Sequence, residues 1–519
     1  MPRARRVLAV VAAQIATGRS LRTFLAPIPA RVLNSARPML RPPIVRAAIV
    51  VTFAFMLVHA LRSGCDHDEI EHLHDAWLVS QGQVPFVDFV EVHHPTVFYV
   101  FAPLARALDP SPRALVFAAR AVDLALLALA LFAFRATAAR TTEDRRAAWA
   151  PLVLLGCFFF ARNSMEVRSD PWMSAFVIAA FWCWARYLGD GGARWAALAG
   201  FAIGCAMVFS QKTVPFAGLI GIGTIVAVAT DRSKWAHAAR GAGLVAICAA
   251  VPILALMVAI RRAGYWNEFA FWNYTFNRYL NLHDARDLGP SFFATIGASA
   301  GEAPVLWAAG LAGVVLAIRR PRIETTIAAV VAVGGLVALF LSKLPWNHDL
   351  LVVQMFLAVL AVPIVDFALR SVRWRTAAAS LVLVMVAKTA VLSTFYSEIP
   401  DGPRVQQAVL AGTSPTDRVA VPPPYHPIFR KDAFYFWVAP GLVVPAYLDL
   451  CARGPCPAGH AAADARAWAE SPPRVAFAPP DEPLWSPPRW DQHRSEYVAS
   501  ATPGLWVRRG SPVEQAQAR

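Results

Sequence analysis

Charged residues are scarce in this sequence. Asp, Glu, Lys and Arg make up 16% of its 519 residues, whereas about 25% is usual for soluble proteins. Acidic residues are the rarer sign, with 34 Asp and Glu against 49 Lys and Arg, so the formal net charge is +15. Low charge together with 57% hydrophobic residues and a mean hydropathy of +0.45 excludes a soluble enzyme and a disordered chain.

Cysteine is also sparse, with seven residues and no pair of C-x-x-C units, so a cysteine-based metal framework is excluded. Cys451 and Cys456 lie close together in a polar C-terminal tail, and they can form a disulfide if that tail lies outside the cytoplasm. Four others lie inside apolar runs, where cysteine packs as a small hydrophobic residue: Cys157, Cys183, Cys205 and Cys248.

Long apolar runs dominate what is present. They are about 15 to 25 residues long, and a bilayer core of about 30 Å needs about 20 apolar residues per helix. A β-barrel is excluded because its strands would alternate over about 10 residues. The sequence predicts an all-α polytopic membrane protein with eleven transmembrane helices, near residues 45–61, 114–134, 147–161, 171–188, 195–209, 214–230, 241–260, 303–318, 325–342, 350–369 and 376–395.

Basic residues gather in every second loop between these spans, which is the positive-inside pattern rather than a nucleic-acid-binding face. We therefore expect no nucleic acid partner. The pattern predicts a basic cytoplasmic leader at 1–44, a transmembrane domain at 45–395 and an outer loop at 62–113. It also predicts that residues 396–519 form a small extracytoplasmic domain, either α/β or irregular.

The segment Pro95–Leu108 is left out of the span count. It is about 14 residues long and carries Pro103 and Arg106, which suits an interfacial or re-entrant helix. Counting it as a span would place the basic clusters outside. Residues 261–302 are polar and aromatic, and this composition predicts a second helix lying in the membrane interface.

The outer loop 62–113 differs chemically from the rest of the chain, because it holds eight of the 34 acidic residues and five of the 12 histidines. Such a cluster is either a solvated loop or a catalytic or metal site at the membrane face. Its members are Asp66, Asp68, Glu69, Glu71, Asp75, Asp88, Glu91, Asp109, His67, His72, His74, His93 and His94.

The order of residues in this loop is informative. Asp68-Glu69 opens an amphipathic stretch, Ile70–Ser80, which Gln81-Gly82 closes, and His93-His94-Pro95 precedes an aromatic helix. Here the sequence resembles the GT-C superfamily of polyprenyl-phosphate-sugar glycosyltransferases. The resemblance is to the family 39-like branch, which holds protein O-mannosyltransferases and lipid A aminoarabinose transferases.

The resemblance continues downstream over roughly residues 45–350. Arg120 lies near the outer start of the second span, where the family has an arginine. Three further family motifs are matched at outer span ends: Arg168-Ser169-Asp170-Pro171, Ser210-Gln211-Lys212 and Lys343-Leu344-Pro345.

The resemblance implies a GT-C enzyme of the bacterial inner membrane with a periplasmic active site. It would move a sugar from a polyprenyl-phosphate donor to a lipid, glycan or protein acceptor by a single inverting displacement, with membrane lipids around it. Asp68 would be the general base, with Glu69 beside it as a second catalytic residue. The implied donor-phosphate ligands are Lys212, Lys343, Arg120, Arg168 and His94. A divalent metal ion is left open, with Glu91 and Asp170 as its ligands.

Each of these roles has a structural alternative. Asp68 and Glu69 are suited to cap a helix, since acids favour its first turn. Lys212 and Lys343 are suited to snorkel at the interface.

Other residues, and the function as a whole, have alternatives too. Arg120 and Asp123 are spaced i, i+3 and can neutralise each other, while His72 and His74 suit a solvated surface. At the level of function, the alternatives are a polytopic transporter or lipid flippase, whose ionisable residues would lie at mid-membrane, and a non-catalytic membrane scaffold.

Overall fold

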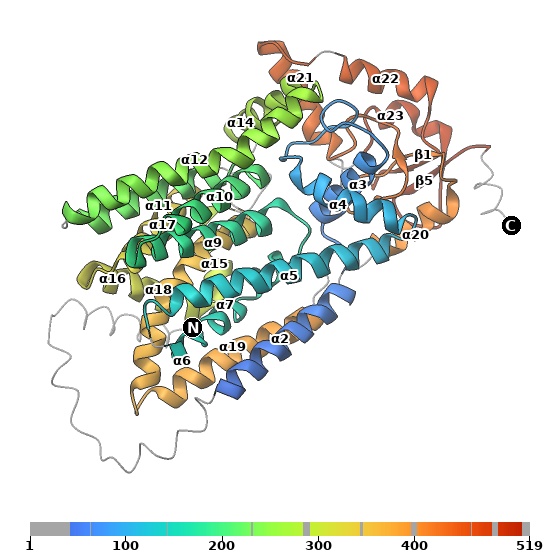
Figure 1. Ribbon diagram of the computed structural model, residues 1–519. Helices are drawn as coiled ribbons and strands as arrows, with labels where there is room; N and C mark the ends of the chain where they lie inside the picture. Colours follow the sequence, from blue (N-terminus) through green and yellow to red (C-terminus); the bar gives the residue numbers. More distant parts are fainter. Residues whose placement is uncertain are drawn as a thin grey trace.

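The computed structural model describes residues 42–510 apart from 63, 143, 230–231, 284–290, 343–345, 396–401, 458 and 480–485. Most of the predicted leader 1–44 and Lys343 therefore lie outside the described residues. The described chain forms a long bundle of helices with a small mixed domain at one end (Figure 1).

Helices occupy all eleven positions predicted as spans, although two short helices replace the third. In chain order they are α2 (Pro42–Arg62), α5 (Pro112–Ala138), the pair α7 (Ala150–Leu155) and α8 (Phe158–Asn163), α9 (Ser169–Asp190), α10 (Ala193–Phe209), α11 (Thr213–Val228), α12 (Arg232–Arg262), α16 (Pro304–Arg319), α17 (Ile323–Leu341), α18 (Leu351–Arg370) and α19 (Arg375–Phe395). In the described part of the chain, six helices are long and apolar enough to cross a membrane. The number is seven if α15 (Phe292–Glu302) and α16, which meet at a 106° bend, count as one span.

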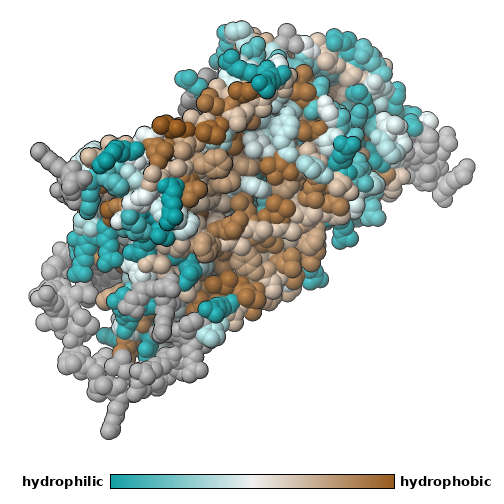
Figure 2. All heavy atoms as spheres, in the orientation of Figure 1, coloured by the Kyte–Doolittle hydropathy of each residue, from teal (hydrophilic) through white to brown (hydrophobic). Residues whose placement is uncertain are grey.

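α18 lies at the centre of the bundle because it is apolar on every face, and all residues from Leu351 to Val362 are buried. α16 packs closely on it through Gly313, where an added Cβ would lie 2.0 Å from the Leu360 carbonyl oxygen. The first and last helices of the bundle, α2 and α19, lie side by side (Figure 1). Hydrophobic surface covers the middle of the bundle between two hydrophilic ends (Figure 2), as expected for a protein that spans a bilayer.

The outer loop folds into two short helices, α3 (His67–Ser80) and α4 (Thr96–Leu108), which pack against each other. α4 confirms the predicted short helix, and at 13 residues it is too short to span a bilayer. The aromatic region folds into α13 (Trp266–Ala270), the π-helix η4 (Phe271–Phe276) and α14 (Asn277–His283).

The C-terminal tail is an α/β domain, which decides between the two predicted alternatives. Its five-stranded sheet has the order β2-β1-β3-β5-β4, in which β1 runs parallel to β2 and β3, and β5 runs antiparallel to β3 and β4. The elements are α20 (Gly402–Gly412), β1 (Arg418–Ala420), β2 (Lys431–Asp432), α21 (Pro440–Arg453), α22 (His460–Glu470), β3 (Val475–Phe477), α23 (Trp490–His493), β4 (Tyr497–Ala499) and β5 (Leu505–Arg508).

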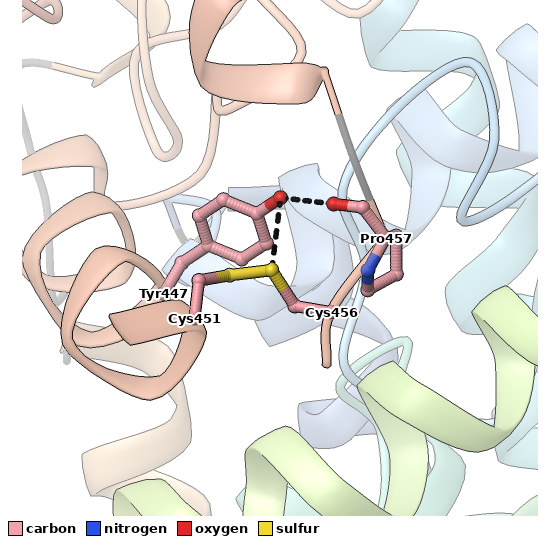
Figure 3. The surroundings of a disulfide bond; sticks show 4 residues. All are labelled: Tyr447, Cys451, Cys456 and Pro457. Atoms are coloured by element: carbon pink, nitrogen blue, oxygen red, sulfur yellow. Dashed lines mark hydrogen bonds between the residues drawn. A yellow bond between two sulfur atoms is a disulfide. The ribbon is translucent and has the colours of Figure 1, made fainter. Parts of the chain in front are cut away.

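A disulfide joins Cys451, in the last turn of α21, to Cys456, as predicted (Figure 3). The hydroxyl of Tyr447 donates to the carbonyl of Pro457 and lies 3.9 Å from the Cys456 sulfur. The disulfide therefore closes the short loop between α21 and α22.

Candidate active site

The N-terminus of α3 presents its two acidic residues in different directions. Asp66 is the N-cap, and its carboxylate accepts from the Asp68 backbone amide at 3.1 Å. Asp68 and Glu69 are therefore not needed as caps. The side chain of Asp68 is 25% exposed, whereas that of Glu69 is fully buried.

Asp68 forms an ion pair with Arg168, which lies just before α9. Arg168 Nη1 lies 2.7 Å from Asp68 Oδ2, and Arg168 Nη2 lies 2.7 Å from Asp66 Oδ1. Burial alone would raise the pKa of Asp68, but the Arg168 guanidinium and the nearby imidazoles of His67, His348 and His93 together outweigh it and hold that pKa well below its usual range. Asp68 is therefore ionised, as a general base must be.

Three residues missed in the sequence complete this cluster. Glu166 Oε2 lies 3.1 Å from Arg168 Nε, and His348 Nδ1 accepts from Arg168 Nη1 at 2.7 Å. Arg162 bridges Glu166 Oε1 at 2.7 Å and Asp66 Oδ2 at 3.2 Å. Asp66 was visible within the acidic loop, and Arg162 and Glu166 lie in a short predicted outer loop, but no local pattern linked them to Asp68.

Lys212, between α10 and α11, is held by two carboxylates. Its Nζ donates to Asp170 Oδ1 at 3.0 Å and to Asp349 Oδ1 at 2.7 Å. Asp170 lies in the first turn of α9, and Asp349 lies in the 3₁₀ helix η6 (Asn347–Leu350). Burial alone would lower the pKa of Lys212, but the two carboxylates outweigh it and raise the pKa. The lysine is 42% exposed, so it remains a charged group that a ligand can reach.

Glu69 and Arg120 lie elsewhere, in a buried ion pair. Arg120 Nε donates to Glu69 Oε1 at 2.7 Å, and the same guanidinium donates to the carbonyls of Ala60 and Gly64 at 2.9 Å each. The pair joins α2, α3 and α5. Asp123, considered as a partner for Arg120, instead accepts from Trp172 Nε1 at 2.9 Å.

Glu91 and His94, from the loop before α4, are both buried. Glu91 Oε1 accepts from the amides of Val92 and His93 at 2.6 and 2.7 Å and contacts His93 Nδ1 at 2.7 Å. His94 Nδ1 lies 3.3 Å from the Val208 carbonyl. Burial lowers the pKa of His94 to about 4, so the ring is neutral and its Nδ1–H donates to that carbonyl.

The predicted metal ligands are regrouped around Glu71, a residue the sequence had not singled out as a ligand. Glu71 forms one candidate group with His67 and Asp68 and a second with Glu91 and His93, and the ligand atoms of each group lie within 4.8 Å of one another. Among the described residues, Asp170 belongs to neither group.

The donor chemistry of these groups fits a divalent ion. Burial and the nearby Glu91 carboxylate raise the pKa of Glu71 well above its usual value. Glu71 contacts His67 Nε2 at 3.4 Å and His93 Nδ1 at 4.0 Å. Converging carboxylates and imidazoles suit zinc or manganese, and a bound cation would remove the repulsion between the two buried acids.

The C-terminal domain holds α3 in place through His74. His74 Nδ1 contacts the Ile428 carbonyl at 2.5 Å, and its Nε2 contacts Asp432 Oδ2 at 2.7 Å. The Ile428 amide donates to His426 Nδ1 at 3.1 Å, so the proton of neutral His426 is on Nε2, which faces Asp432 Oδ1 at 3.3 Å. This tautomer leaves His426 Nε2 without a lone pair for a metal, and the cluster is therefore a hydrogen-bonded link between two domains.

No family model and no curated protein matches the sequence. Solved structures do match. ArnT from Cupriavidus metallidurans bound to undecaprenyl phosphate has a TM-score of 0.62 at 14% identity, covering 89% of this chain and 96% of ArnT. Its apo state gives a TM-score of 0.60 at 15% identity over the same shares. The Archaeoglobus fulgidus oligosaccharyltransferase in complex with zinc and sulfate gives 0.50 at 11% identity, over 69% of this chain and 55% of that protein. The chain therefore shares the fold of ArnT, which agrees with the sequence resemblance to the GT-C superfamily.

Proposed function

We propose that this protein is a membrane glycosyltransferase that moves a sugar from a polyprenyl-phosphate donor to a lipid, glycan or protein acceptor. The observation that carries the proposal is the ion pair of Asp68 with Arg168. Arg168 also donates to His348, and the next residue, Asp349, accepts from Lys212. The arrangement places an ionised carboxylate, which can accept a proton, near cationic side chains, which can bind a phosphate. The ArnT structure bound to undecaprenyl phosphate, which shares this fold, supports a donor of that class.

The reaction is a single displacement with inversion at C1 of the sugar. The acceptor oxygen forms a bond to C1, the bond from C1 to the phosphate oxygen breaks, and the acceptor proton passes to Asp68. Lys212 and Arg168 stabilise the negative charge of the departing polyprenyl phosphate. When Arg168 turns from Asp68 to the phosphate, the carboxylate loses its counter-charge and becomes a stronger base.

The proposal includes a divalent metal ion bound next to Asp68. Glu71, Glu91 and His93 would hold it, which leaves the Asp68 carboxylate free to act as the base. Such an ion would supply positive charge for a phosphate oxygen. Glu69 and Arg120 are assigned a structural role, because each is the other's buried partner.

The protein would lie in a bacterial inner membrane with all eleven predicted spans crossing, and with α3 and the C-terminal domain on the periplasmic side. The alternation of basic loops supports this orientation. The Cys451–Cys456 disulfide supports it as well, since disulfides persist outside the reducing cytoplasm.

The test is an assay of the purified full-length protein with a panel of polyprenyl-phosphate sugars and a membrane-extract acceptor. We expect release of polyprenyl phosphate with at least one sugar, and loss of this release in Asp68→Asn. A parallel arm with a chelator reports whether the reaction needs the ion. Lipid movement between leaflets without any release of polyprenyl phosphate would instead establish the transporter or flippase alternative.

A further inference from the structure

A second, chemically different pocket lies among the helices. It has a volume of about 430 Å³ and is lined by residues of α9, α10, α11 and α12, mostly small or apolar ones. Alanines 238, 242 and 246 line it from α12, and Gly221 lines it from α11. None of the charged residues of the candidate active site contributes to its lining. Its volume is in the range of sites that bind small ligands.

The pocket exists because α11 and α12 pack on different neighbours. α10 packs so closely on α12 that a Cβ added at Gly200 would lie 2.3 Å from the Val245 carbonyl oxygen. α11 instead packs on α17, where a Cβ added at Gly223 would lie 2.8 Å from Ile327 Cα. The helix is thereby held away from α12, and the small residues facing the gap do not fill it.

Two polar side chains that line the gap, Trp184 and Thr224, are hydrogen-bonded to each other. Trp184 Nε1 donates to Thr224 Oγ1 at 2.8 Å, and Thr224 Oγ1 donates to the Ile220 carbonyl at 2.8 Å. A stable buried water molecule needs two to four hydrogen-bond partners, and this mostly apolar pocket offers few. Water is therefore a poor occupant. α12 is also the least buried of the membrane-span candidates, so the pocket borders the bilayer. An apolar chain from the membrane is the occupant that suits it.

Cations lie at one end of the pocket. Lys234 precedes Ala238 by one helical turn on the same face of α12, and its side chain is exposed. Arg194 and Arg240, also exposed, lie near the same ends of α10 and α12. These residues are within a turn or two of the lining and can meet the phosphate of a lipid headgroup, as basic pockets between transmembrane helices do.

This cationic end is opposite to the candidate active site. Trp184, which lines the pocket, lies 14 residues after Asp170 on α9, or about 21 Å along the helix. A headgroup at Lys234 would therefore lie in the other leaflet from a donor phosphate at Lys212. We propose that the pocket between α9, α10, α11 and α12 binds one acyl chain of an anionic membrane phospholipid, with its phosphate at Lys234.

Two glycines of α11 give a matched test. A Cβ added at Gly221 or at Gly218 would meet nothing within 4 Å, but only Gly221 lines the pocket. Gly221→Leu therefore places added bulk at the pocket, and Gly218→Leu, one turn earlier, adds the same bulk at a position that does not line it. Ala242→Leu fills the pocket from α12 and serves if Gly221→Leu does not fold.

The measurement is lipid retention by native mass spectrometry, on full-length protein purified from bilayers that contain phosphatidylglycerol, phosphatidylcholine and undecaprenyl phosphate. We expect bound phosphatidylglycerol on the wild type and on Gly218→Leu, and at least a tenfold loss in Gly221→Leu or Ala242→Leu. Lys234→Gln should reduce the preference for phosphatidylglycerol over phosphatidylcholine.

Two results would overturn the proposal. One is undiminished phosphatidylglycerol on the pocket-filling variants. The other is undecaprenyl phosphate as the retained lipid, which would assign the pocket to the donor chain. Neither readout depends on glycosyltransferase activity, so this proposal and the proposed function can fail separately.

Discussion

Arg168 donates to the Asp68 carboxylate at 2.7 Å, and with its other terminal nitrogen it contacts Asp66 at the same distance. One guanidinium thus neutralises the N-terminal end of α3 while it also bonds His348. Without a donor, Asp68, the proposed base, is therefore already ion-paired with Arg168, one of the cations proposed to bind the leaving phosphate. In the proposed mechanism, a donor phosphate bound at Arg168 would therefore compete with Asp68 for this guanidinium.

Replacing Asp68 by asparagine tests the base. The amide keeps the size of the side chain but cannot take a proton, so turnover should fall about 10²- to 10⁴-fold. Folding should be preserved, because the N-cap is Asp66. The matched control is Asp88→Asn, in the same loop, where the carboxylate is exposed and accepts from the Val84 amide at 2.7 Å. Full activity of folded Asp68→Asn would remove the basis for the assignment.

Replacing Arg168 by glutamine should change the pH profile of kcat/KM. In the wild type the pKa of Asp68 is depressed, so the pair contributes stability above the unfolded value of 3.8 and loses it as the pH falls through the folded value. Without Arg168, burial dominates and the pKa of Asp68 rises. An acid limb should then move toward neutral pH in the variant. Arg186→Gln, which disrupts an exposed pair with Asp190, should leave the profile unchanged, and identical profiles for all three proteins would contradict this account.

For the buried ion pair of Glu69 with Arg120 we expect an effect on stability rather than on catalysis. Glu69→Gln leaves a buried guanidinium without its counter-charge, which typically destabilises a protein by about 3 to 5 kcal/mol. Thermal unfolding of the purified protein should show this loss. Glu470→Gln, in an exposed pair with Arg466, should cost less than about 1 kcal/mol. A Glu69→Gln protein that is stable but inactive would instead favour a catalytic role.

Donor recognition is tested at Lys212. Lys212→Ala removes a charge-assisted bond worth about 1.5 to 3 kcal/mol, or roughly 10- to 150-fold in kcat/KM for the donor. Lys212→Arg should recover part of this loss, because the charge remains. We expect the same behaviour for Lys343, from its sequence motif. Arg319→Ala, at the exposed end of α16, is the control for a cation elsewhere. Unchanged donor kinetics in the alanine variants of both Lys212 and Lys343 would assign these two lysines to a role as interfacial anchors.

Orientation can be measured with reporter fusions after Ala138, Asp190 and Gly412, which end α5, α9 and α20. The basic loops predict that the first two lie in the cytoplasm and the third lies outside. Protein purified without reductant should also contain oxidised Cys451 and Cys456. A cytoplasmic signal at Gly412 would contradict the eleven-span arrangement.

The sequence by itself determined where the helices lie, because hydropathy and helix ends depend on neighbouring residues. It located α4 as a short helix, the C-terminal tail as a separate domain, and the acidic loop 62–113 as the part of the chain that holds most of the candidate catalytic residues. It also paired Cys451 with Cys456, which are only five residues apart. Each of these features follows from residues close together in the chain.

Only the tertiary structure decided which charges meet. Asp68 and Glu69 are adjacent in sequence but point in different directions on α3, so one reaches Arg168 and the other is buried against Arg120. Glu166 and His348 joined the site from distant segments, and His74 joined α3 to Asp432 of the C-terminal domain. The physical reason is that burial and pairing of an ionisable group depend on the elements packed around it, and no local pattern specifies those neighbours.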